Sequence, residues 1–148
     1  MLRSPVAWIP SRHGGQLAAP TVEYVEGRPG AIYRRPEGTP VVAPVNGTIE
    51  SFGEQGDAGL VIALRSSSGN VVVLSHLMRT LTTLTVGQSV TQGQVLALVG
   101  HSGKSAANRL RMEIQDVDGK YVDPLIGRTR QAAAPSDIAE GLQGDALK

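Results

Sequence analysis

The sequence predicts an all-β domain, and three observations support this prediction. Glycine and proline are frequent, at 18 and 9 of the 148 residues, and they separate short runs of Val, Leu and Thr. Several runs alternate apolar and polar residues with a period of two, as half-buried strands do. Turn signals such as Asn46-Gly47 stand between the runs. The length suits one domain with its own core.

Composition excludes several classes of function. The chain has no cysteine, which rules out cysteine-based zinc sites, disulfides and thiol nucleophiles. A net charge of +1 and few aromatic residues give no basis for nucleic-acid binding. No apolar run approaches the length of a membrane span. Residues 1–10 are interrupted by Pro5 and Pro10 and lack the apolar core of a secretory signal, so we expect no export.

The first part of the chain predicts an arm followed by a β-meander. Prolines break residues 1–27, so we expect an extended arm with one possible short strand at 21–25. Strands are predicted at 41–45 and 48–52 around the Asn46-Gly47 turn. The apolar runs 60–64 and 71–74 flank a Ser/Gly/Asn turn and predict a hairpin that is buried on both faces.

The second part predicts short strands, one alternating strand and a tail. Residues 85–100 place glycines at sharp turns between short strands. In the strand 109–114, Arg109, Arg111 and Glu113 share a face that should line a cleft or meet solvent, while the other face enters the core. A hairpin turn follows at 116–120. Residues 127–148 are predicted to be a flexible tail, with one short helix at 132–140 capped by Ser136.

Four sequence motifs resemble those of the LytM-type (M23) zinc peptidases of bacterial cell walls. They are Gly-Thr-Pro-Val-Val-Ala-Pro at 38–44, Ser-His-Leu at 75–77, the Val-Gly-Gln…Gly-Gln-Val-Leu block at 86–96 and Val-Asp-Pro at 122–124. The resemblance covers residues 28–126. It implies an antiparallel sheet with a duplicated-hybrid or lipoyl-like β-barrel core, between the 1–27 arm and the 127–148 tail.

The same resemblance implies that the zinc ligands are missing. The family holds zinc with a His, an Asp four residues later and the second His of a His-x-His motif, and this sequence has Arg28, Ile32 and Arg111 at those places. Arg109 stands at the first His of that motif. An alternative alignment on His13 has leucine at the Asp position. A guanidinium has no lone pair to give a metal. We therefore expect no zinc cofactor and no catalysis.

The degenerate cleft leaves two alternatives open. Arg28, Arg109 and Arg111 are predicted to form an anion-binding groove near His76, which matches the family histidine that assists the attacking water. Such a groove would bind carboxylates of peptidoglycan stems or of an acidic protein. Alternatively, Arg109 and Arg111 pair internally with Glu113, Glu37 or Asp123 and close the cleft.

These expectations give three hypotheses about function. The favoured one is a non-catalytic structural or interaction subunit that contacts other protein subunits, with a bacteriophage tail or baseplate as its setting, because no export signal is apparent. The second is a peptidoglycan-binding module, or a regulator of a separate cell-wall hydrolase, in the cell envelope or periplasm. The third is a zinc endopeptidase that uses different ligands, with His76 joined by His13 or His101.

Overall fold

The computed structural model describes residues 4–6, 19–80, 83–105 and 107–125. Within these residues it contains ten strands and a single turn of 3-10 helix. The elements are β1 (Thr21–Val25), β2 (Arg28–Tyr33), β3 (Pro40–Val42), β4 (Gly47–Glu54), η1 (Gly56–Ala58), β5 (Leu60–Ser66), β6 (Val71–Thr80), β7 (Ser89–Val90), β8 (Val95–Val99), β9 (Leu110–Gln115) and β10 (Tyr121–Val122). The all-β prediction is confirmed.

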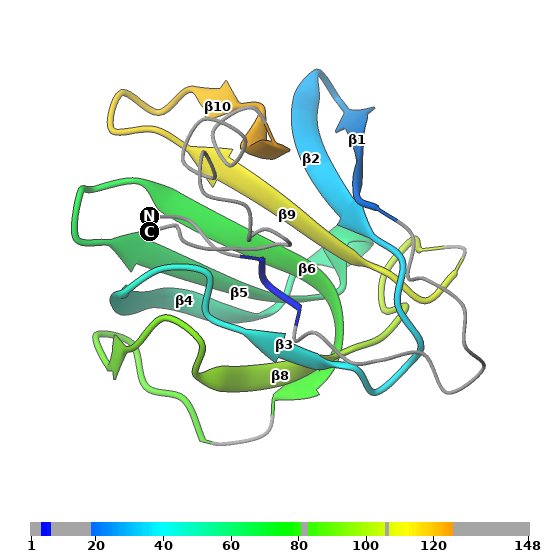
Figure 1. Cartoon of the computed structure of the whole chain (residues 1–148), viewed down its shortest axis with the longest axis horizontal. Coiled ribbons are helices and arrows are strands. Elements are labelled where there is room, and N and C mark those ends of the chain that lie inside the picture. The colour runs from blue at the N-terminus through cyan, green and yellow to red at the C-terminus, as the bar shows by residue number, and fades with distance from the viewer. Residues whose placement is uncertain (1–3, 7–18, 81–82, 106, 126–148) are drawn as a thin grey trace.

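The strands form one antiparallel sheet in the order β1-β2-β9-β6-β5-β4-β7 (Figure 1). Strand β6 pairs with β9 through residues 71–75 and with β5 through residues 71–74 and Leu77, and its second half pairs with β8. Strand β8 in turn pairs with β3, so these two short strands lie beside the main sheet (Figure 1). Strand β10 adds to β9 on the same side as β2.

The hydrophobic core joins the main sheet to the β3–β8 pair. Its largest fully buried side chains come from both, including Tyr33, Ile49, Leu74, Leu96 and Leu110. Val6, in the short described part of the arm, is also in this core, and Pro5 O accepts a 2.7 Å hydrogen bond from Val42 N. This part of the arm therefore packs on its own domain, beside β3.

Most predicted strands form, with changes at their ends. Strand β1 has the predicted bounds, and it pairs along its whole length with β2 although it lies in the segment predicted as an arm. Strand β3 stops at Val42, earlier than predicted. The β5–β6 hairpin and the β9–β10 turn form as predicted. Strand β5 is buried on both faces, whereas the start of β6 alternates between buried and half-buried positions.

Strand β6 is much longer than the predicted 71–74 run because a β-bulge lets it change partners. Leu60 pairs with Leu77 and Ile62 with Leu74, so β6 carries one extra residue there. His76 lies in this bulge with φ +64°, a backbone conformation uncommon for a residue other than glycine. The bulge redirects β6 from the main sheet toward β8.

The predicted tail and its short helix at 132–140 lie outside the described residues, which end at 125.

Within the described ranges, no helix has the length and apolar character needed to cross a bilayer.

Candidate functional site

The three positions that match the family's zinc ligands, Arg28, Ile32 and Arg111, lie on neighbouring strands, β2 and β9, whereas His76 lies on β6 and Arg109 just before β9. The register sets Ile32 opposite Arg111 and Ala31 opposite Met112. Because side chains alternate along each strand, Ile32 and Arg111 share one face of the sheet, opposite to the face of the core residues Ala31 and Met112. Ile32 is buried yet does not belong to the core cluster. Arg28 lies four residues before Ile32, at the start of β2.

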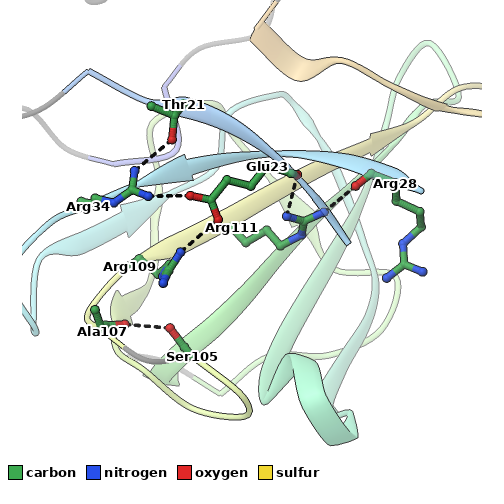
Figure 2. A network of polar contacts seen from close by, with 8 residues as sticks. All are labelled: Thr21, Glu23, Arg28, Arg34, Ser105, Ala107, Arg109 and Arg111. Carbon is green, nitrogen blue, oxygen red and sulfur yellow. Dashed lines mark hydrogen bonds and ion pairs between the residues drawn. The ribbon is translucent and has the colours of Figure 1, made fainter. Parts of the chain in front are cut away.

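The Arg111 side chain is buried and bonded on three sides. Its Nε donates to Glu113 Oε2 at 2.9 Å, and its Nη2 lies 2.8 Å from the same oxygen. The guanidinium also donates to two backbone carbonyls, Glu23 O at 3.0 Å and Arg28 O at 2.8 Å (Figure 2). Arg111 and Glu113 are each only 5% exposed. Arg111 therefore ties β9 to both β1 and β2.

Glycine at position 30 makes room for this guanidinium. A Cβ atom built on Gly30 would lie 2.3 Å from Arg111 Cζ and 2.6 Å from its Nη1. No real side chain tolerates such distances, so any other residue at position 30 would have to displace the guanidinium or the backbone. The Arg111 side chain thus packs directly on the backbone of β2.

Arg28 lies at the edge of this buried pair. Its Nε is 3.4 Å from Glu113 Oε2, and its Nη1 is 3.5 Å from Glu26 Oε1. The Arg28 Cζ also lies 5.4 Å from the centre of the Tyr121 ring, within cation–π range. Its side chain is 36% exposed, so Arg28 contacts Glu113 from the solvent side.

Arg109 does not join the Arg111 network through its side chain. Its Nη1 donates to Glu23 Oε1 at 3.2 Å. The other carboxylate oxygen, Glu23 Oε2, accepts from Arg34 Nη2 at 2.5 Å, and Arg34 Nη1 donates to Thr21 Oγ1 at 2.9 Å (Figure 2). A single carboxylate on β1 therefore bridges two guanidiniums.

His76 is held by the loop that follows β8. Its Nδ1 lies 2.8 Å from Ser102 O, and a carbonyl oxygen only accepts, so Nδ1 carries the proton. The Ser102 hydroxyl donates to Leu77 O at 2.6 Å and accepts from Leu60 N at 3.0 Å. Ser102 therefore fixes the loop against both β5 and the bulge of β6.

Replacing Ser102 with alanine should lower the free energy of unfolding by about 2 kcal/mol, since it leaves Leu60 N–H and Leu77 C=O without their side-chain partner. Chemical denaturation measures this loss. Ser105→Ala is the matched control, because among the described residues the Ser105 hydroxyl bonds only Ala107 O, in an exposed contact of the same loop. Equal losses for the two variants would contradict the assigned role of Ser102.

These residues do not fit a zinc ion. The three ligand positions carry two guanidiniums and an aliphatic chain, which offer no lone pair to a metal. Within the described ranges, no group of three His, Cys, Asp or Glu side chains could hold a metal ion. The hypothesis of other ligands named His76, His101 and His13. Here His101 bonds Asn108 Oδ1 and His76 bonds Ser102 O, while His13 lies outside the described residues.

The structure corrects one expectation about the charged face of β9. We expected Arg109, Arg111 and Glu113 to line an open cleft or meet solvent, but Arg111 and Glu113 are both buried. The physical reason is that β1 widens the sheet beside β2 and supplies a carbonyl acceptor to Arg111. The sequence left two alternatives for Arg111, an anion-binding groove or internal pairing, and in the structure Arg111 pairs internally with Glu113. The carboxylate partner of Arg109 is Glu23 rather than the candidates named from the sequence.

Sequence reasoning missed the role of Glu23 and the strand that faces it. Residues Arg28–Tyr33 form β2, where no strand was predicted because Pro29 and Gly30 are unusual in strand interiors. Glu23 pairs with Gly30 across β1 and β2. Period-two spacing places Thr21, Glu23 and Val25 on one face of the predicted strand, but only the pairing of β1 with β2 and of β2 with β9 shows that this face is the one with the arginines.

A family model described as "Peptidase family M23" matches residues 26–124. A protein of Haemophilus influenzae named "Uncharacterized metalloprotease" is 34% identical over 108 residues, covering 72% of this chain and 22% of that protein. The "Peptidoglycan DD-endopeptidase ShyC" of Vibrio cholerae is 27% identical over 133 residues, covering 88% of this chain and 30% of that protein. The chain thus spans less than a third of the length of these relatives.

Solved structures show the same fold. A zinc-containing peptidase from Vibrio cholerae superposes with a TM-score of 0.62 at 25% identity, covering 81% of this chain and 37% of that one. The antimicrobial peptidase lysostaphin from Staphylococcus simulans superposes with a TM-score of 0.68 at 22% identity, covering 82% and 53%. The motifs, the sheet and the family match over residues 26–124 lead to one conclusion: the chain belongs to peptidase family M23.

Proposed function

We propose that this chain is a non-catalytic M23 module that acts through binding, as a structural or interaction subunit. The observation that supports this most strongly is the Arg111 guanidinium, which is buried at a ligand position and bonded to Glu113 and to two backbone carbonyls. A fixed positive charge in that place repels a metal cation. Arg28 adds a second positive charge at another ligand position, and Ile32 at the third offers no donor atom to a metal.

The retained histidine fits the same proposal. His76 lies in the β6 bulge, and its Nδ1 proton is donated to Ser102 O. General-base catalysis in a hydrolase requires a water that is bound and polarised beside the base. With arginines at the ligand positions, no metal would activate such a water near His76.

A cleavage assay tests the proposal. We expect the purified chain to release no fragments from peptidoglycan sacculi, with or without added zinc, since no described set of ligands fits the metal. The His76→Ala variant should give the same baseline, which shows that any trace signal comes from contamination. Zinc-dependent release by the wild-type chain that disappears in His76→Ala would overturn the proposal and favour an endopeptidase with different ligands.

Two settings are proposed for such a module. The first is a bacteriophage tail or baseplate in the virion, where the module contacts neighbouring protein subunits through its surface and through segment 127–148, whose Ala-rich and polar composition suits contacts with a partner. The second is the cell envelope, where the module binds peptidoglycan or regulates a separate hydrolase. The second setting draws support from the relative named as a peptidoglycan DD-endopeptidase. Co-sedimentation with purified virions and with peptidoglycan sacculi distinguishes the two.

A further inference from the structure

The single carboxylate of Glu23 lies between two guanidiniums, each bonded to one of its oxygens. Its two oxygens lie 3.2 Å from Arg109 Nη1 and 2.5 Å from Arg34 Nη2 (Figure 2). Two guanidiniums thus share one carboxylate. Moreover, the Nε of Arg109 is buried and, among the described residues, has no hydrogen-bond partner. Buried polar nitrogens are nearly always bonded, so this one marks an incomplete site.

The cluster is open enough for a ligand to reach it. The side chains of Glu23 and Arg34 are 42% and 44% exposed, and that of Arg109 is 21% exposed. Exposed ion pairs are weak because water and salt compete with them. The Glu23 side chain can therefore leave without large cost. Its backbone carbonyl is held separately by Arg111, so β1 stays in the sheet when the side chain moves.

We propose that Arg34 and Arg109 form a carboxylate-binding site and that Glu23 blocks it in the free protein. A carboxylate from a partner would replace that of Glu23 and accept hydrogen bonds from both guanidiniums, which suit planar, two-pronged acceptors. The inference rests on the proposed function, in which the module works by binding. The carboxylate comes either from an acidic protein segment or from a peptidoglycan stem peptide.

The test compares Glu23→Gln with the wild-type chain. The variant keeps the size of the side chain and removes the competing charge. The probe is a blocked tri-glutamate peptide, with blocked tri-glutamine as the neutral control, and binding is followed through the NMR Nε–Hε signals of Arg34 and Arg109. We expect Glu23→Gln to bind tri-glutamate at least tenfold more tightly than wild type does. Addition of Arg109→Gln should abolish that gain.

Glu26→Gln is the matched control. Glu26 lies on the same hairpin and its loss changes the net charge equally, but its side chain is 80% exposed and pairs with Arg28 rather than with Arg34 or Arg109. We expect Glu26→Gln to bind the probe as wild type does. Equal gains in the two variants would show a general charge effect and overturn the proposal. No gain in a Glu23→Gln chain with unchanged thermal stability would overturn it as well.

A second probe, a soluble peptidoglycan stem peptide with free carboxylates, distinguishes the two sources. Tighter binding of tri-glutamate indicates an acidic protein segment, and tighter binding of the stem peptide indicates the cell wall. If neither probe binds, the proposed carboxylate site is wrong, but the non-catalytic assignment still stands, because the peptidoglycan cleavage assay tests that assignment separately. Cleavage by the wild-type chain would remove the assignment whatever the probes do.

Discussion

Replacement of Arg111 with alanine is expected to lower the free energy of unfolding by about 3 to 5 kcal/mol, because it leaves the Glu113 carboxylate buried without its close cation. Arg28 lies 3.4 Å from the same oxygen at the solvent edge, and it replaces little of what is lost. Urea denaturation followed by circular dichroism measures the change. The same variant also loses the links from β9 to the carbonyls of Glu23 and Arg28.

Two further variants make this result specific. Arg65→Ala removes another two-bond arginine–glutamate pair, in which Arg65 Nε and Nη2 lie 2.9 and 3.0 Å from the two Glu50 oxygens. Hydrogen bonds from Arg65 lower the pKa of Glu50, yet both groups are exposed, so stability should hardly change. The double variant Arg111→Met with Glu113→Leu should recover most of the loss. If the Arg111→Ala chain proved as stable as the Arg65→Ala chain, the claim that the buried Arg111–Glu113 pair stabilises the fold would be wrong.

Replacement of Gly30 with alanine is the second large effect we expect. The new Cβ would lie 2.3 Å from Arg111 Cζ, and the guanidinium cannot move away without losing its bonds to Glu113 and to two carbonyls. The cost should be about 1 to 3 kcal/mol, as for other overpacked sites. Gly30 does not have a left-handed φ, so the loss comes from the collision and not from backbone strain.

A double-mutant cycle checks the cause of this loss. In an Arg111→Ala background the collision is absent, so Gly30→Ala should cost much less than it does in the wild-type chain. The two changes should therefore be coupled by about 1 kcal/mol or more. Additive losses would show that Gly30 serves some other purpose than making room for Arg111.

The sequence was sufficient to predict the class of fold and most of its strands. Alternation identified the β9 strand, and unbroken apolar content identified β5, since both patterns follow directly from which faces of a strand are buried. Strand β2 was missed because Pro29 and Gly30 have low strand propensity. Gly30 is needed there for a reason that lies far along the chain, in the side chain of Arg111.

The candidate site was predictable only in part, for a similar reason. Local patterning placed Arg109, Arg111 and Glu113 on one face, but it could not tell whether that face was covered. Burial of Arg111 depends on the pairing of β1 with β2, which brings Glu23 to the arginines from about 88 residues away in the chain. Likewise, the role of Ser102 depends on contacts with β5 and β6 that no local motif encodes.

The zinc content of the purified wild-type chain, after dialysis against excess zinc and then against buffer, tests the central claim most directly. The claim is that Arg28, Ile32 and Arg111 stand at the zinc-ligand positions of an M23 domain and leave it without a zinc site. We predict a zinc content near zero, with the Arg111 network left intact. One tightly held zinc per chain would contradict the claim and would make His76, with His13 or His101, the first residues to replace.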